Sequence, residues 1–156
     1  MKFQVTRTFA ASREAVWTAL NETETLQACI PGCKEFTGSP KDGFTAVVKR
    51  KVGPIKATFK VNVMLSDVVP LTSYTLTAAG TGRMAGVTKG RANVTLGDAD
   101  GGGTDLHYDI DTRVGGTIAK LGSRRIDSFM HRMSDRFLER LQTRLEGGAM
   151  AQSPGP

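Results

Sequence analysis

Residues 117–146 carry the pattern of one long amphipathic helix, and this segment limits the folds open to the chain most strongly. It contains no proline and one glycine, Gly122, and glycine pairs flank it at 115–116 and 147–148. Thirty residues at helical rise extend about 45 Å, so one side of the helix needs a broad apolar surface to cover it. Its apolar residues recur at intervals of three and four: Ile118, Leu121, Ile126, Phe129, Met130, Met133, Phe137, Leu141 and Leu145.

Most of the preceding chain is expected to supply β-strands, because its apolar residues alternate with polar ones. Short connections such as Asp42-Gly43 and Gly53-Pro54 favour antiparallel pairing of neighbouring strands. A short helix capped by Ser12 and one or two further turns over 24–29 follow the first strand. The expected strands are 2–9, 33–38, 44–52, 55–66, 72–79, 84–96 and 104–114. The pattern predicts an α+β fold, with a seven-stranded antiparallel sheet curled around the long C-terminal helix.

Length and charge bound the domain organisation and the partners. The 156 residues predict one domain at 1–146, followed by a disordered tail of small, polar and proline residues at 147–156. Lys and Arg total 21 against 15 Asp and Glu, and this net charge of +6 favours acidic partners or anionic membranes and gives little support for nucleic acid. No apolar run spans a bilayer and the N-terminus does not resemble a signal peptide, so we expect a cytoplasmic protein.

Several motifs, in order along the chain, resemble one known family. They are LQACIPGC at 26–33, KVGPIK at 51–56, the glycines of Gly80-Thr81-Gly82 and Lys89-Gly90, and VGGTIAKLGSR at 114–124. Together they are similar to the family of the carbon monoxide dehydrogenase G subunit (CoxG-type), within the START-like (SRPBCC, helix-grip) superfamily. The resemblance covers about residues 2–145.

The resemblance implies a helix-grip fold with an apolar cavity between sheet and helix that holds a hydrophobic small molecule. CoxG-type proteins are associated with molybdenum hydroxylases of the carbon monoxide dehydrogenase type. They are implicated in bringing that enzyme to the membrane and, in some members, in binding a quinone. The implied function is a carrier or recruitment factor at the inner face of the membrane, with no required cofactor. Some members carry an apolar C-terminal anchor, and no such segment precedes Pro156.

Candidate ligand-binding residues are those expected on the inner side of the sheet and helices. The inward polar residues are few, mainly Tyr74, Thr104, Tyr108, Thr112 and Ser123, which suits orientation of an apolar ligand better than acid–base chemistry. We expect no catalytic residues, because strand order and parity bring no Ser-His-Asp, Cys-His or carboxylate pair together. The cavity candidates are Trp17, Leu26, Ile30, Arg50, Phe59, Tyr74, Tyr108, Ile126, Phe129, Met130 and Met133.

Two functional alternatives stay open at this stage. One is a START-like enzyme that acts on a small apolar substrate through cavity hydroxyls or an inward arginine. The other is a protein-interaction subunit whose cavity is closed by side chains. Arg7 and Arg50 both fall on the inward parity and need a partner if buried. Either they reach solvent at the strand ends, or one binds a polar ligand head at the cavity mouth, with Asp127 as an alternative structural partner.

Two rows of basic residues are candidates for contact with an acidic partner or lipid headgroups. Lys49, Lys51, Lys56 and Lys60 are expected on the outer face of two neighbouring strands. Arg132, Arg136, Arg140 and Arg144 follow the i,i+4 spacing of one helix edge, partly offset by Asp135 and Glu139. A solvated helix edge is the simpler interpretation of the arginine row.

Cysteines and glycines are expected to serve the fold. Cys29 and Cys33 flank Pro31-Gly32, and we expect small buried hydrophobes, with a reactive or disulfide-forming pair as the alternative. A zinc site needs about four ligands, so none is expected. Gly80, Gly82, Gly86 and Gly90 do not fit a phosphate-binding loop, because Lys89-Gly90 enters a strand. They are expected to let the sheet bend and bulge while leaving room for a ligand.

Overall fold

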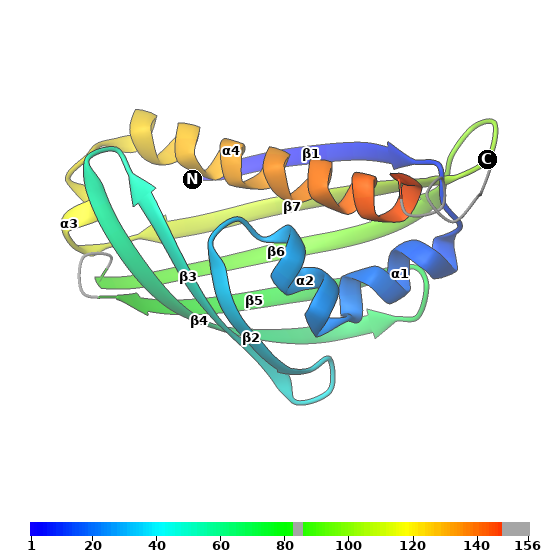
Figure 1. Ribbon diagram of the computed structural model, residues 1–156, viewed down its shortest axis with the longest axis horizontal. Helices are drawn as coiled ribbons and strands as arrows, with labels where there is room; N and C mark the ends of the chain where they lie inside the picture. Colours follow the sequence, from blue (N-terminus) through cyan, green and yellow to red (C-terminus); the bar gives the residue numbers. More distant parts are fainter. Residues whose placement is uncertain (83–85, 148–156) are drawn as a thin grey trace.

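The computed structural model describes residues 1–82 and 86–147, in which seven antiparallel strands form one curved sheet (Figure 1). The strands are β1 (Lys2–Phe9), β2 (Cys33–Ser39), β3 (Gly43–Val52), β4 (Ile55–Val69), β5 (Ser73–Gly82), β6 (Gly86–Asp98) and β7 (Thr104–Val114). Their order is β1-β7-β6-β5-β4-β3-β2. This confirms the predicted α+β fold. Residues 148–156 of the expected tail lie outside the described residues.

Alternation of apolar and polar residues produces a sheet with one buried and one solvated face, as predicted. In β3, for example, Phe44, Ala46 and Val48 are buried while Lys49 is exposed. The bulge expected at the glycines of β5 and β6 is absent, because Ser73–Gly82 pairs with Gly86–Thr95 without a register shift. The described register shifts lie instead in β2 and β4.

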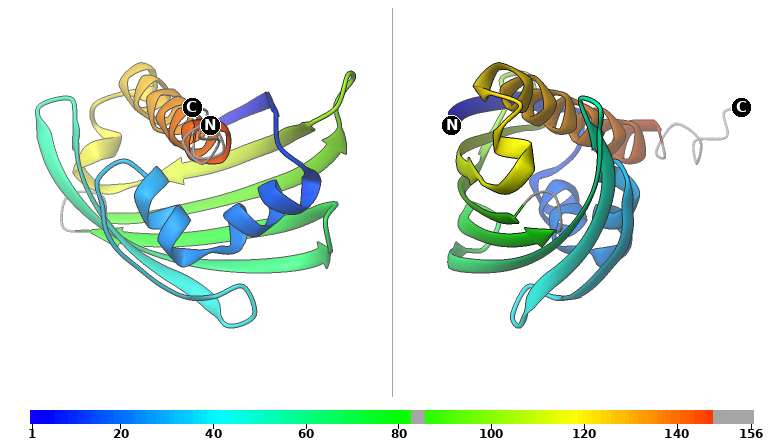
Figure 2. Two further views of the ribbon diagram at one scale, coloured as in Figure 1. Left: turned by 45° about the vertical axis from the view of Figure 1, so that its right-hand side comes forward. Right: turned by 90° about the vertical axis from the view of Figure 1, so that its left-hand side faces the viewer.

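Helices α1 (Arg13–Asn21) and α2 (Thr23–Cys29) cover one end of the concave face (Figures 1 and 2). The Ser12 hydroxyl accepts a hydrogen bond from the Ala15 N–H at 3.1 Å and so satisfies one of the unpaired donors at the start of α1. The buried side of α1 includes Val16 and Leu20, which join the largest apolar cluster of the protein. This end of the molecule is therefore filled by side chains.

The long C-terminal segment is two helices, and the prediction of one helix over 117–146 is wrong at its start. Helix α3 (Gly116–Ala119) is a single turn, and α4 (Ser123–Gln142) begins after Gly122 and continues into a π-helical turn, η1 (Thr143–Gly147). Gly122 has φ +90° and ψ 157°, a conformation that cannot continue a helix and that is open almost only to glycine. The break turns Ile118 into the interior, where it is 2% exposed.

Helix α4 packs across the concave face of the sheet with the apolar side that the sequence predicts (Figure 1). Its most buried positions also include Leu138, which is 0% exposed, and Ser134, and neither belonged to the predicted stripe. Both lie on the same helical side as Leu141, within about two turns of it. No helix in residues 1–82 and 86–147 is both long and apolar enough to cross a membrane.

Candidate ligand-binding site

Side-chain size along the sheet decides where the interior is hollow. Near α1, one row across β5, β6 and β7 consists of Tyr74, Val94 and Tyr108. Four residues away along each strand, the corresponding row is Ala78, Gly90 and Thr112. The first row reaches α1 and α4 and fills the core, whereas the second cannot span the distance to α4. A cavity follows from this difference in volume.

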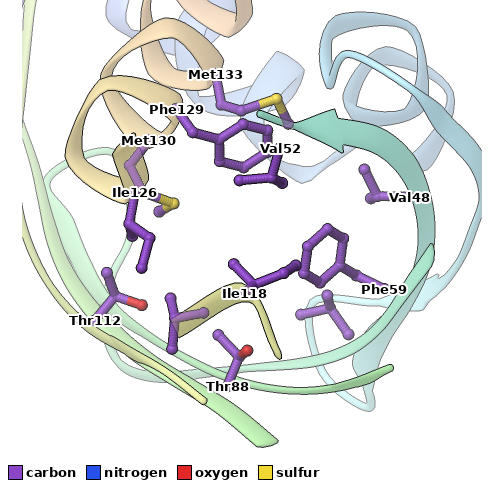
Figure 3. A pocket seen from close by; sticks show the side chains of 12 residues that line it. Val48, Val52, Phe59, Thr88, Thr112, Ile118, Ile126, Phe129, Met130 and Met133 are labelled. Atoms are coloured by element: carbon purple, nitrogen blue, oxygen red, sulfur yellow. The ribbon is translucent and has the colours of Figure 1, made fainter. Parts of the chain in front are cut away.

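The cavity lies between the sheet and helices α3 and α4, and it has two adjoining compartments. Figure 3 shows the residues that line the helix-side compartment. The helix-side compartment has a volume of about 190 Å³ and is lined by Val48, Val52, Phe59, Val61, Thr88, Thr112, Val114, Ile118, Ile126, Phe129, Met130 and Met133. The sheet-side compartment has a volume of about 220 Å³ and adds Leu76, Ala78, Gly80, Gly90, Arg91, Ala92 and Ile110. Five residues line both: Phe59, Val61, Thr88, Thr112 and Met130.

The lining suits an apolar ligand. Each compartment is larger than an engineered apolar cavity of about 150 Å³ that binds benzene. Met130 and Met133 have flexible thioether side chains that adapt to ligands of different outline. The hydroxyls of Thr88 and Thr112 are the polar side-chain groups on the sheet side of the cavity in Figure 3, opposite Phe129 and Met133. Arg91 contributes to the sheet-side lining, but it is an exposed residue on the opposite strand parity.

The structure brings five of the eleven predicted ligand-binding residues together at the cavity: Phe59, Ile126, Phe129, Met130 and Met133. Four more pack in the core beyond the lining. Trp17 contacts Tyr74 edge to face at 5.5 Å between ring centroids, and Leu26 and Ile30 pack in a cluster with Phe36. They lie outside the cavity because α1 and α2 fill the opposite end of the concave face.

Tyr108 also lies outside the cavity, because its hydroxyl is paired with the buried Ser134 hydroxyl of α4. Burial raises the pKa of Tyr108 and also that of Tyr74. Both phenols therefore stay neutral at physiological pH. The structure places these hydroxyls in the packed core and gives neither of them access to a ligand in the two compartments.

The two inward arginines do not line either compartment. Arg7 donates to Oε1 of Gln142 at 3.2 Å, so its partner is on α4 but is not Asp127, which lies beside His131 at 3.5 Å. The side chain of Arg50 crosses Gly32, and its buried Nε has no hydrogen-bond partner within the described residues. The prediction that Arg50 lines the cavity is therefore wrong, because the aliphatic part of its side chain packs against Gly32 instead.

The sequence reasoning missed most of the sheet side of the cavity. Thr88 and Gly90 lie on the same side of β6 as the inward-facing Ala92, Val94 and Leu96. The alternation of this strand therefore predicts that both residues face the interior. Gly80 and Gly90 line the sheet-side compartment, so the expected room for a ligand is present there. A side chain added at Gly90 would meet Thr112 Oγ1 at 3.4 Å, an ordinary contact, so glycine at this position leaves space.

Basic residues surround the end of the sheet where the cavity lies. The turn between β3 and β4 packs against α3 there, through Val52, Ile55, Ile118 and Leu121. We define the basic rim as the exposed residues Lys51, Lys56, Lys89, Arg113, Lys120 and Arg124 at this end. Two like-charge pairs face each other directly across strands, Lys51 with Lys56 and Lys89 with Arg113. No rim residue forms an ion pair within the part of the chain that the structure describes.

The predicted basic rows are exposed as expected. Lys49, Lys51, Lys56 and Lys60 lie on the outer face of β3 and β4. Arg132, Arg136 and Arg140 lie along α4, and Arg144 lies in η1. Asp135 and Glu139 form no ion pair with that row in residues 1–82 and 86–147. Arg140 and Arg144 border a polar hollow of about 440 Å³ between α2 and the end of α4, which lacks the apolar lining of the cavity.

The cysteines are free thiols, with Cys29 1% exposed and Cys33 partly buried. Burial raises the pKa of both thiols, which disfavours the reactive thiolate form. Within the described segments, no three His, Cys, Asp or Glu side chains gather in a way that would hold a metal ion. The interpretation of Cys29 as a small buried hydrophobe therefore agrees with its surroundings.

Comparison with known proteins adds a family and a fold. The family model for the carbon monoxide dehydrogenase G subunit (CoxG) matches residues 3–146. A conserved protein from Geobacillus kaustophilus superposes with a TM-score of 0.86 at 21% identity, covering 93% of this chain and 95% of that chain. A START superfamily protein from Mycobacterium smegmatis gives a TM-score of 0.67 at 14% identity, with coverage of 94% and 97%. These likenesses show a START-like fold. No protein of curated function has significant sequence similarity to the chain.

Proposed function

Because the chain belongs to the CoxG family, named after the G subunit of carbon monoxide dehydrogenase, we propose that it is a non-catalytic carrier of one apolar small molecule. The observation that carries this proposal is the cavity between the sheet and helices α3 and α4. The apolar side chains that line the two compartments lack packing partners on their inner side, which loses dispersion contacts. A bound apolar molecule restores those contacts, which favours a carrier over a subunit whose interior is closed by side chains.

A quinone is the ligand that we propose, and a molybdenum-containing enzyme of the carbon monoxide dehydrogenase type is the proposed partner. The family name suggests the partner, and the sequence resemblance suggests the quinone. A quinone ring is flat and apolar and carries carbonyl oxygens, which agrees with a lining of aliphatic, aromatic and threonine side chains. The cavity has two hydroxyls but no histidine or carboxylate in its lining, which favours holding a ligand over acid–base catalysis.

The basic rim is the proposed contact surface for an anionic partner, at the membrane or on the enzyme. Like charges directly opposite on neighbouring strands destabilise a sheet, so Lys51 opposite Lys56 and Lys89 opposite Arg113 do not serve folding. Their position beside the cavity would bring an anionic surface to the place where an apolar ligand has to enter or leave.

Thermal unfolding with a water-soluble quinone tests the carrier proposal. The probe is 2,3-dimethyl-1,4-naphthoquinone, which has no open ring position for reaction with the cysteines. At about 100 times its Kd, a ligand that binds only the native state stabilises it by about 2.7 kcal/mol, which raises Tm by several degrees. We expect this rise for the natural chain and its loss in Gly90→Val, which fills the sheet-side compartment.

The matched control is Gly97→Val, the same substitution on the same strand, at a position with no atoms within 4 Å of the added Cβ. Gly97 lies on the outer parity of β6, so this variant should keep the ligand-dependent rise in Tm. An unchanged Tm of the natural chain at saturating probe, or an equal rise in Gly90→Val, would refute quinone binding in this cavity.

A further inference from the structure

The hydroxyl of Thr88, in the lining that the two compartments share, is a buried polar group without a partner among the described residues. Thr88 lines both compartments, and its Oγ1 has no hydrogen-bond partner among the described residues. The side chains around it in the helix-side compartment are apolar except for Thr112 (Figure 3). A buried hydroxyl without a partner destabilises the fold, and most buried polar groups in native proteins are paired. A ligand bound in the cavity could supply the partner that the described residues do not.

Thr112, on the neighbouring strand β7, provides a useful contrast. Its Oγ1 donates a hydrogen bond to the carbonyl oxygen of Lys89 at 3.1 Å. Its proton is thus used within the sheet, and only its lone pairs remain for a ligand. Thr88 has both its proton and its lone pairs unused, although the two threonines lie on adjacent strands and line the same compartments.

We infer that Thr88 selects, among apolar ligands, those that carry an oxygen acceptor in the middle of the molecule. The inference rests on the proposed carrier function and adds to it the residue that selects the ligand by its oxygen acceptor. The donor lies at the junction of the two compartments, so a ligand that fills both must place its acceptor between two apolar parts. Ketones, quinones and similar neutral carbonyl compounds meet this condition. Pure hydrocarbons leave the hydroxyl unpaired, and carboxylates would bring an uncompensated charge into an apolar site.

A matched pair of probes separates the hydrogen bond from the fit of the ligand. One probe is 2,3-dimethyl-1,4-naphthoquinone and the other is 2,3-dimethylnaphthalene, which has the same fused rings but no oxygen. Titration followed by intrinsic fluorescence or calorimetry gives the Kd of each for the natural chain, Thr88→Val and Thr88→Ser. Valine keeps the shape and the strand preference of threonine but cannot donate a hydrogen bond, whereas serine can.

We expect Thr88→Val to lose about tenfold in affinity for the quinone, the effect of one buried hydrogen bond, and to bind the hydrocarbon unchanged within about twofold. Thr88→Ser should keep the preference for the quinone. Without ligand, Thr88→Val should be at least as stable as the natural chain, because it removes an unpaired hydroxyl. Thr112→Val should be less stable, because it removes the bond to Lys89.

Two results would overturn the inference, and they can be told apart from failure of the carrier proposal. Equal losses for both probes in Thr88→Val would show an effect of shape alone. Unchanged affinity of Thr88→Val for the quinone would show that Thr88 does not bind the carbonyl, although the cavity still holds apolar rings. If neither probe binds the natural chain, the carrier proposal itself fails, and the selection by Thr88 fails with it.

Discussion

At the scale of single residues, two buried hydroxyls connect the long helix to the sheet. Tyr108 on β7 and Ser134 on α4 are both buried and share a hydrogen bond. A serine inside the apolar side of a helix is unfavourable unless it is paired, and here its partner is a tyrosine of the sheet. This pair therefore fixes the position of α4 on the sheet beside the cavity.

The pair predicts a non-additive effect on stability. Ser134→Ala leaves the Tyr108 hydroxyl buried without this partner, so we expect the free energy of unfolding to fall by about 1–3 kcal/mol. Tyr108→Phe combined with Ser134→Ala removes both hydroxyls and should lose less than the sum of the two single variants. Urea unfolding of all four chains measures this difference. Additive effects would mean that the two hydroxyls do not stabilise one another.

At the scale of elements, the break between α3 and α4 shapes the cavity. Because the chain turns at Gly122, α3 leaves the line of α4 and places Ile118 against Val52 and Ile126 at the end of the cavity. Figure 2 shows α3 across this end of the curled sheet. A continuous helix of 30 residues would carry Ile118 along the axis of α4 and leave this end without that side chain.

The break predicts a strict requirement for glycine at position 122. Alanine there has open space around its Cβ but must adopt φ +90° with ψ 157°, so we expect Gly122→Ala to lower the free energy of unfolding by about 1–3 kcal/mol. Gly97→Ala is the control, because its Cβ also has open space and its φ is not in the positive range. Denaturant unfolding should show little change for Gly97→Ala. Equal stability of both variants would contradict the strain at Gly122.

At the scale of the whole molecule, charge is distributed unevenly between the two ends of the sheet. Acidic residues gather at the α1 end and its turns, as at Glu14, Asp67, Asp98 and Asp100. The cavity end carries the basic rim, and Asp111 and Asp127 are the acidic residues described near it. Beside the cavity, the six basic residues of the rim thus outnumber these two acidic residues. Such an asymmetry orients a protein toward an anionic surface before contact.

The asymmetry predicts salt-dependent binding to anionic membranes through one end of the protein. Lys51→Glu reverses one rim charge and so changes the net charge by two elementary charges. Each is worth about 1 kcal/mol of binding free energy near an anionic membrane. Affinity for vesicles of phosphatidylcholine and phosphatidylglycerol should therefore fall roughly 30-fold. The introduced carboxylate would face Lys56 across the strands, so stability should stay equal or rise slightly. Vesicle sedimentation and denaturant unfolding measure the two effects.

Lys41→Glu provides the matched control, because Lys41 is an exposed lysine in the turn between β2 and β3, away from the basic rim. It should keep vesicle binding close to that of the natural chain. Binding of the natural chain should weaken above about 0.15 M salt, where screening acts within about 8 Å. Equal losses for Lys41→Glu and Lys51→Glu would indicate non-specific attraction and contradict docking through the rim.

The sequence by itself determined the seven strands, the two short helices α1 and α2, and most of the inner side of each element. Strand alternation, turn residues such as Asp42-Gly43 and the spacing of three and four in α4 are local patterns, and local geometry alone decides which side chains share a face. For this reason the strands, their antiparallel order and the buried residues of β3, β6 and β7 could all be predicted. Phe59, Ile126, Phe129, Met130 and Met133 could be assigned to the cavity on the same grounds.

The tertiary structure alone decided which part of the inner side is filled and which part is hollow. Strand alternation predicts that both Tyr74 and Gly80 face inward. However, α1 and α2 cover only one end of the sheet. At the other end, the pairing register of β5, β6 and β7 places small residues from all three strands side by side. Trp17, Leu26, Ile30 and Tyr108 consequently pack in the core, while Thr88 and Ile118 reach the cavity. The volume of the cavity depends on the sizes of side chains that come together from distant segments. No local sequence pattern can therefore predict it.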